Sequence, residues 1–151
     1  MKRRSCRAIV ITDNQLITMY REKEGNIYYT FPGGGMEGEE QKESCVKREC
    51  IEEFGIEVEP IREVYTYENE TTIQYFFLCN WISGEFGSGV GEEFQDDRNK
   101  GKYQPTLMPL DKIKSLPLMP PEVARQLDLD IKNFGVRLRP DTLHIQHSHE
   151  S

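Results

Sequence analysis

Three glutamates near the middle of the chain are spaced so that together they could bind a divalent cation. Glu49, Glu52 and Glu53 stand at positions i, i+3 and i+4, which lie on one face of an α-helix. Three carboxylates on one face repel each other, and carboxylate oxygens are the ligands that Mg²⁺ and Mn²⁺ prefer. The spacing therefore predicts a helix whose acidic face binds Mg²⁺ or Mn²⁺.

The opposite face of this helix carries an apolar stripe. Val46, Cys50 and Phe54 recur at every fourth residue, a pattern typical of a helix that packs against a core. Gly55 follows the last apolar position and is a typical helix stop. We expect the helix to run from about Glu39 to Phe54.

A glycine-rich segment precedes this helix and could bind phosphate. Gly33, Gly34 and Gly35 follow Pro32, and glycines in a turn let a ligand approach the backbone closely. The start of a helix also favours anionic oxygens. Arg21, in a polar loop expected over residues 21–26, could reach a phosphate as well, although a solvated loop arginine is the alternative.

Acidic helices with a glycine stop are also common as plain solvated surfaces. Here the spacing back to Gly34 and Glu40, the Arg48 immediately before the first glutamate, and the lead-in YTFPGG favour a functional site. The segment 34–56, GGMEGEEQKESCVKRECIEEFGI, resembles the box of the Nudix hydrolase (MutT-like) family and departs from it only mildly, at Cys50. The motif resemblance covers about residues 29–56.

This resemblance implies a fold and an activity. The fold would be α/β, a Nudix-type α/β/α sandwich with a mixed β-sheet. The activity would be Mg²⁺-dependent hydrolysis of a nucleoside diphosphate linked to another group, X. The order of substrates that we expect is a nucleoside triphosphate or modified nucleotide, then a nucleotide sugar such as ADP-ribose, then a dinucleoside polyphosphate.

The resemblance also assigns roles to residues. Glu52 and Glu53 would bind the metal together with the Gly33 carbonyl, and Glu49 would be a further ligand or the general base. Arg48 would orient a neighbouring glutamate, so that Glu49, Arg48 and Glu53 form the catalytic set. Glu40 would belong to the outer metal shell or to the helix start.

A further metal ligand or base is expected from a loop after the box. The segment Ser83–Lys102 is rich in glycine and acidic residues, and long loops in compact domains are often functional. Nudix enzymes often complete metal binding with such a carboxylate, which makes Glu92 or Glu93 the candidate. A flexible, solvated loop is the alternative.

The alternation of apolar and polar residues predicts the order β, β, β, α, β, β, β, α. We expect strands at 7–12, 15–20, 27–31, 58–67, 71–83 and, as the last strand, 106–110, with a second helix at 122–134. That helix should pack through Val123, Leu127, Ile131 and Phe134. Tyr75, Phe76, Phe77 and Trp81 should be mainly core residues, of which one or two could stack on a base.

The composition limits the class of partner. The chain has 151 residues and a net charge of −7, which argues against non-specific binding to nucleic acids or membrane surfaces. The N-terminal basic cluster at 2–7 lacks the apolar core of a signal peptide. We expect one domain over 1–140, a flexible tail over 141–151 that holds the three histidines, four free thiols, a cytoplasmic location and a monomer or homodimer.

Two functions from other classes stay open. A nucleotide-sensing Nudix module would bind its ligand without cleaving it, but such modules usually have a damaged box. An enzyme that processes RNA ends would need a basic groove, which the composition does not supply. A small-molecule nucleotide is therefore the expected partner.

Overall fold

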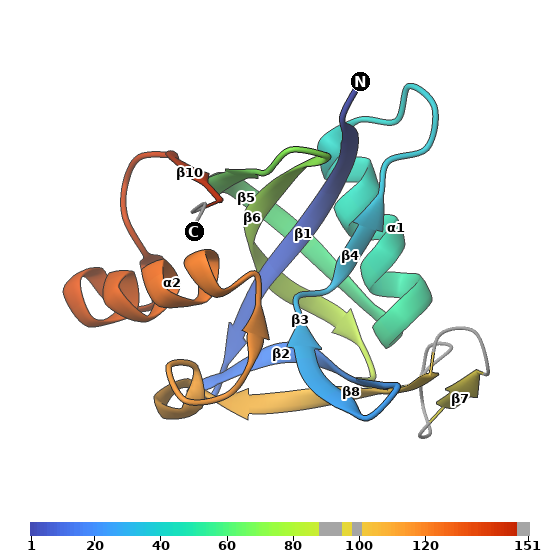
Figure 1. Ribbon diagram of the computed structural model, residues 1–151. Helices are drawn as coiled ribbons and strands as arrows, with labels where there is room; N and C mark the ends of the chain where they lie inside the picture. The colour runs from blue at the N-terminus through green and yellow to red at the C-terminus, as the bar shows by residue number, and fades with distance from the viewer. Residues whose placement is uncertain (88–94, 98–100, 148–151) are drawn as a thin grey trace.

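The computed structural model describes residues 1–87, 95–97 and 101–147 (Figure 1). In chain order, the helices and strands are β1 (Arg3–Thr12), β2 (Gln15–Lys23), β3 (Asn26–Thr30), β4 (Gly33–Gly35), α1 (Lys42–Phe54), β5 (Ile56–Glu68), β6 (Thr72–Gly84), β7 (Gln95–Asp97), β8 (Gly101–Pro109), β9 (Leu118–Met119), α2 (Pro121–Phe134) and β10 (Leu143–Gln146). Short 3₁₀ turns stand at Leu110–Lys112 and Gly135–Arg137. The expected order is confirmed, with additional short strands.

Two tight turns fold the first three strands against each other. Asp13 and Asn14 both have positive φ, 49° and 61°, as a type I′ hairpin turn requires. Glu24 and Gly25 repeat this pattern between β2 and β3, with φ of 52° and 82°. The polar loop expected over 21–26 is therefore wrong. Arg21 lies within β2, paired on one side with β3 and on the other with β8.

The sheet is mixed, as expected. Its main path runs β10-β5-β6-β1-β2-β3-β9, while β4 pairs with β1, and β8 pairs with β2. The pairs β1·β6, β10·β5 and β3·β9 are parallel, and the other pairs are antiparallel. Because β1 pairs with β2 only next to their turn, at Ile11 and Thr12, the sheet bends there into two parts.

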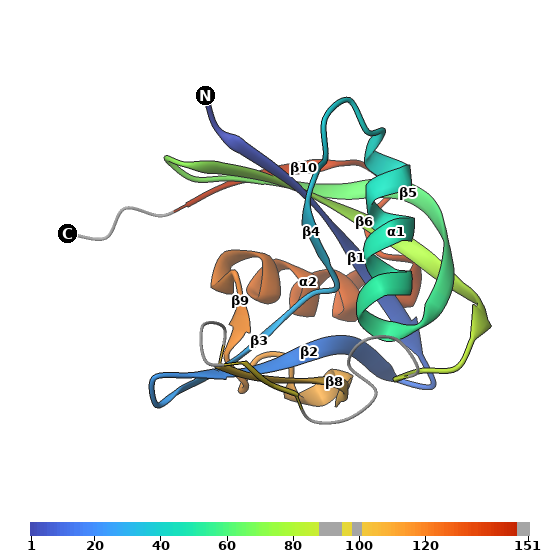
Figure 2. The ribbon, with the colours of Figure 1, turned by 90° about the vertical axis from the view of Figure 1, so that its right-hand side faces the viewer.

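One helix covers each face of the larger part of the sheet (Figures 1 and 2). The buried side of α1, which includes Val46, Cys50 and Phe54, packs in one cluster with the alternate β1 residues Cys6 and Ala8. The first turns of α2 pack in the other cluster, with β1 and β6. The α/β/α sandwich and the apolar stripe of α1 are thus confirmed. All four cysteines are buried and unpaired, as predicted.

The packing of α2 corrects one expectation. Val123 and Leu127 are fully buried and Ile131 is partly buried, but Phe134 is 48% exposed. The last turn of α2 extends past the strands (Figure 1), so Phe134 has no sheet to pack against. Of the aromatic residues in β6, Phe76 and Phe77 are buried, and Tyr75 and Trp81 are partly exposed.

The C-terminal part of the chain also differs from the prediction. Residues 106–110 do not form the last strand, because β9 and β10 follow, and β10 pairs in parallel with β5. The expected flexible tail over 141–151 is therefore wrong for Leu143–Gln146, which cover an otherwise unpaired strand edge. His147 also lies 2.8 Å from Glu122 Oε2, while 148–151 fall outside the described residues.

The acidic segment after β6 is partly regular. Its start and end belong to β6 and β8, and the backbone of Gln95–Asp97 forms β7 against β8. Glu92 and Glu93 lie outside the described residues. In the described part of the chain, neither helix combines the length and apolar composition that a membrane span requires.

A buried acid ties α2 to the sheet. Asp130 is 1% exposed, and its Oδ2 accepts a 2.5 Å hydrogen bond from the Tyr65 hydroxyl of β5. Its Oδ1 accepts a bond from Gln126 Nε2 at 3.0 Å and lies 3.7 Å from Arg139 Nη1. A buried carboxylate with these partners costs little, but removing it leaves the Tyr65 hydroxyl buried without an acceptor.

We therefore expect Asp130→Ala to lower the free energy of unfolding by about 2 kcal/mol or more. The matched control is Asp128→Ala on the same helix, which removes one ion pair with the exposed Lys132 and should cost less, about 1 kcal/mol. Urea denaturation followed by circular dichroism measures both. Equal losses in the two variants would contradict this account of how α2 is anchored.

Candidate active site

The glycine-rich segment forms a strand and not the expected turn. Gly33–Gly35 makes up β4 and pairs antiparallel with Arg7, Cys6 and Ser5 of β1. Backbone bonds from Ala8 N to the Pro32 carbonyl at 2.8 Å and from Met36 N to the Arg4 carbonyl at 3.0 Å continue the pairing at both ends. We expected a turn because glycines allow many backbone conformations. Instead, β1 supplies hydrogen-bond partners for the backbone of this segment, which therefore forms a strand.

The first two glycines are needed because other atoms occupy the space of a side chain. A Cβ at Gly33, where φ is +144°, would lie 2.0 Å from the Cys6 carbonyl oxygen. A Cβ at Gly34 would lie 2.2 Å from Oε2 of Glu49. At Gly35 the nearest atom is Arg3 Nη2, at 3.2 Å. The absence of a side chain at Gly34 thus makes room for a carboxylate of α1.

The helix that carries this carboxylate begins later than expected. It starts at Lys42 and not at Glu39, because residues 37–40 form a turn in which the Glu40 N–H donates to the Glu37 carbonyl at 2.9 Å. Glu40 Oε1 in return accepts from the Glu37 N–H at 3.1 Å. The helix ends as predicted, at Gly55 with φ 71°.

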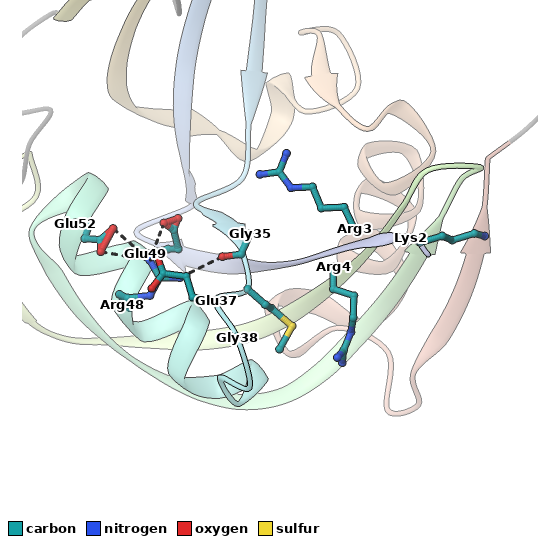
Figure 3. Close-up of a pocket in the computed structure, with 10 residues that line it drawn as sticks. Lys2, Arg3, Arg4, Gly35, Glu37, Gly38, Arg48, Glu49 and Glu52 are labelled. Carbon is teal, nitrogen blue, oxygen red and sulfur yellow. Dashed lines mark hydrogen bonds and ion pairs between the residues drawn. The ribbon is translucent and has the colours of Figure 1, made fainter.

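Arg48 connects the acidic residues with β4 (Figure 3). Its guanidinium donates to both carboxylate oxygens of Glu40, at 2.8 and 3.0 Å, and to the Gly35 carbonyl at 3.2 Å. The remaining nitrogen lies 3.4 Å from Glu49 and 3.3 Å from Glu52. Hydrogen bonds from Arg48 lower the pKa of Glu40 to about 2. Arg48 thereby holds Glu40 in place, while its role in orienting a metal ligand stays a prediction.

Glu53 and Glu49 lie against β4 in a poorly solvated position. Oε1 of Glu53 accepts a 3.1 Å hydrogen bond from the Gly33 N–H. Burial raises the pKa of Glu53 to about 7, a rise that the Gly33 bond opposes and the charge of Glu49 increases. Burial also raises the pKa of Glu49, against the charge of Arg48. Glu52 points to the rim, where its side chain is 52% exposed.

The donor set fits a hard dication. Glu49 and Glu53 offer carboxylate oxygens whose charged forms are disfavoured by burial and by each other, and a cation between them would offset both costs. Gly33 could add its carbonyl, which already accepts one bond from Arg7 at 3.1 Å and has a second lone pair. Within the described ranges, no three His, Cys, Asp or Glu side chains stand close enough to hold a metal unaided.

Arg7 is a site residue that the sequence analysis missed. Its Nη1 donates to the carbonyls of Phe31 and Gly33, both at 3.1 Å, and its Nε donates to Gln74 at 3.2 Å. These partners are neutral, and burial lowers the pKa of Arg7. The alternation of β1 could have suggested it, because Arg7 interrupts the apolar run that starts at Cys6.

Arg21 lies on the same side of the site and carries a charge that acts on Arg7 and Glu53. Its guanidinium stacks over the ring of Tyr103, 5.5 Å from the centroid. Its Nε is buried and has no hydrogen-bond partner among the residues that the structure describes. Arg21 therefore keeps a donor for a ligand, and its contact with a phosphate stays a prediction.

A hollow of about 620 Å³ opens beside these groups (Figure 3). Glu49, Glu52 and Arg48 line one side, Gly35 to Gly38 line the floor, and Lys2, Arg3 and Arg4 line the other side. The hollow thus has an acidic side that could bind metal and a basic side that could bind an anion. Of the predicted metal ligands, Glu93 is outside the described residues, and the ligand roles of the others stay predictions.

Comparisons with known proteins give the family. The family model of the NUDIX domain matches residues 1–128. A search of curated proteins found no match. Solved structures with the same fold include an ADP-ribose pyrophosphatase from Streptococcus suis, with 20% identity, a TM-score of 0.67, and coverage of 97% of this chain and 100% of that chain.

Two further structures are similar. A Nudix hydrolase from Nitrosomonas europaea has 15% identity and a TM-score of 0.70, over 97% of this chain and 80% of that chain. A MutT protein from Bacillus halodurans has 20% identity and a TM-score of 0.61, over 97% and 90%. At these identities the structures show a shared fold, whereas the family model spans most of the chain. The chain belongs to the Nudix hydrolase family.

Proposed function

We propose that this enzyme hydrolyses the diphosphate linkage of a nucleoside diphosphate joined to a group X, with Mg²⁺ or Mn²⁺ as cofactor. The observation that carries the proposal is the placement of Glu49 and Glu53 against Gly34 and Gly33, where both carboxyl pKa values are raised. These two half-buried acids favour a counter-charge beyond the 3.4 Å contact of Glu49 with Arg48, and Nudix hydrolases generally use divalent metals.

Each residue near this pair has a distinct task. Glu49 and Glu53 would hold the metal, which supplies a water of lowered pKa and neutralises phosphate oxygens. Glu49 is the candidate base because it lines the hollow, whereas Glu53 is held by the Gly33 N–H. Arg48 positions Glu49 and leaves Glu52 at the rim as a further ligand. Arg7 and Arg21 would bind phosphate oxygens through charge-assisted hydrogen bonds.

A second hollow, of about 260 Å³, could hold the nucleoside. Its lining includes Arg7 and Gln74 from the strands, and Met119, Pro120 and Pro121 at the start of α2. Apolar walls with a few polar groups are typical of small-molecule sites. Arg7 lines this hollow and also binds the Gly33 carbonyl, so a nucleotide could extend from it toward the acidic residues.

We place nucleoside triphosphates first among the substrates and nucleotide sugars second. A nucleotide sugar occurs in the name of one similar structure, the ADP-ribose pyrophosphatase, and another similar structure is a MutT protein. A non-catalytic sensing module is the alternative from another class, and the complete acidic set of the box disfavours it. The role of Glu93, the cytoplasmic location and the oligomeric state stay predictions.

Replacing Glu53 tests the metal assignment. We expect Glu53→Gln to lower turnover of a nucleotide panel in Mg²⁺ by roughly two orders of magnitude or more, with an unchanged circular dichroism spectrum. The matched control is Glu59→Gln, a change of the same charge at an exposed β5 position, which should keep wild-type turnover. Released phosphate or pyrophosphate is the measurement. Wild-type turnover in Glu53→Gln, or undiminished activity in chelator, would rule out the proposed metal site.

Replacing Gly34 tests the packing of Glu49 against β4. A Cβ at Gly34 would lie 2.2 Å from the Glu49 carboxylate, so Gly34→Ala must displace it and should cost turnover at least about tenfold. Gly35→Ala meets only the flexible end of Arg3, at 3.2 Å, and should cost less. Steady-state kinetics and thermal melts of the two variants give the comparison. A larger loss of turnover in Gly35→Ala than in Gly34→Ala would contradict the idea that Gly34 is needed to make room for the Glu49 carboxylate.

A further inference from the structure

The N-terminal basic residues Lys2, Arg3 and Arg4 lie next to the candidate active site, and the proposed function assigns them no role. Arg3 starts β1 and pairs with Thr72 of β6. Its guanidinium reaches β4, where Nη2 would stand 3.2 Å from a Cβ at Gly35. It lines the same hollow as Glu49 and Arg48. A residue close to the chain terminus thus borders the acidic groups of α1.

Arg3 differs from its two neighbours because it is unpaired. Lys2 forms an ion pair with Glu68, and Arg4 donates to the Tyr75 hydroxyl at 3.2 Å and lies over its ring. In the described part of the chain, no carboxylate lies within 4.0 Å of the Arg3 guanidinium. In a chain with 26 acidic residues and 19 basic ones, a guanidinium that borders an acidic site without an acidic partner is available for an anionic ligand.

The geometry places Arg3 and Glu49 on opposite sides of one dipeptide. A side chain at Gly34 would collide with Glu49, and a side chain at Gly35 would point at Arg3. Since neighbouring Cα atoms are 3.8 Å apart, the guanidinium and the carboxylate are separated by a distance on the order of 10 Å. Figure 3 shows Arg3 and Arg4 leaving β1 in different directions, with Gly35 of β4 between Arg3 and the acidic residues. Arg3 and Glu49 both line the hollow at this strand. A short phosphate chain can span that distance.

We propose that Arg3 binds the terminal phosphate of the substrate and so makes the enzyme prefer a nucleoside triphosphate to a nucleotide sugar. This inference rests on the proposed function. With the cleaved linkage at Glu49 and Glu53, the group X extends toward Arg3. A terminal phosphate there matches the planar fork of a guanidinium and can accept two hydrogen bonds from it. A neutral sugar at the same place offers no charge, and Arg3 contributes little to its binding.

The kinetic test compares two substrates in three variants. We expect Arg3→Gln to lower kcat/KM for a nucleoside triphosphate about tenfold, mainly through KM, and to change kcat/KM for ADP-ribose less than about twofold. Arg3→Lys keeps the charge without the fork and should lie between Arg3→Gln and the wild type. The control is Arg125→Gln on the exposed side of α2, which makes the same change in net charge and should leave both values unchanged. An equal loss for both substrates in Arg3→Gln, or no loss for either, would overturn the proposal.

A binding measurement separates this proposal from the proposed function. Calorimetric titration of the Glu53→Gln enzyme and of the Arg3→Gln/Glu53→Gln double variant with the triphosphate and with ADP-ribose requires no turnover. The expected result is a loss of about tenfold in triphosphate affinity on removing Arg3, with ADP-ribose affinity unchanged. If the wild type hydrolyses neither substrate, the proposed function fails, and this titration still decides the role of Arg3. Equal triphosphate affinity in the two proteins would exclude that role.

Discussion

The contact between the acidic face of α1 and the backbone of β4 is the constraint on which the site depends. The Glu49 carboxylate fills the space of a side chain at Gly34, and Glu53 accepts a hydrogen bond from the Gly33 N–H. This contact requires that α1 be rotated correctly, which its buried stripe ensures by packing on the alternate residues of β1. It also requires that β4 be held in a fixed position beside α1, and the antiparallel pairing of β4 with β1 ensures this. The strand β1 therefore positions both α1 and β4, the two elements that form the site.

The charges of the site are divided between the two sides of β4. On the side of α1, Arg48 compensates Glu40 and Glu52, and burial keeps the carboxyl pKa values of Glu49 and Glu53 raised. Among the described residues, the hydrogen bonds of Arg7 go to neutral acceptors. Beyond the 3.4 Å contact of Glu49 with Arg48, the described residues give Glu49 and Glu53 no cation within ion-pair distance and give Arg7 no anion. A complex of a dication with a phosphate chain would supply both, and this argues for a metal–nucleotide complex as the ligand more strongly than either half alone.

Local features of the site followed from the sequence, and features that depend on distant pairing did not. The spacing of Glu49, Glu52 and Glu53 gave the acidic face, and Gly55 gave the end of α1, because a helix is set by neighbours within a few residues. The strand at Gly33–Gly35 was predicted as a turn, because its partners lie about 28 residues earlier in β1. Arg7 was missed for the same reason, and β10 was missed because only β5 makes it a strand.

Net charge and local charge lead to different conclusions about the ligand. The net charge of −7 opposes a long polyanion, which would contact the acidic surface over its whole length. A small polyanion responds only to charges within about one Debye length, ~8 Å at physiological ionic strength. Within the described residues, Arg3, Arg7 and Arg21 have no acidic partner within ion-pair distance, so the field beside β4 can attract phosphates although the surface as a whole repels them. The acidic composition therefore opposes a long polyanion but is compatible with a small nucleotide, and the arginines beside β4 are where we propose that its phosphates bind.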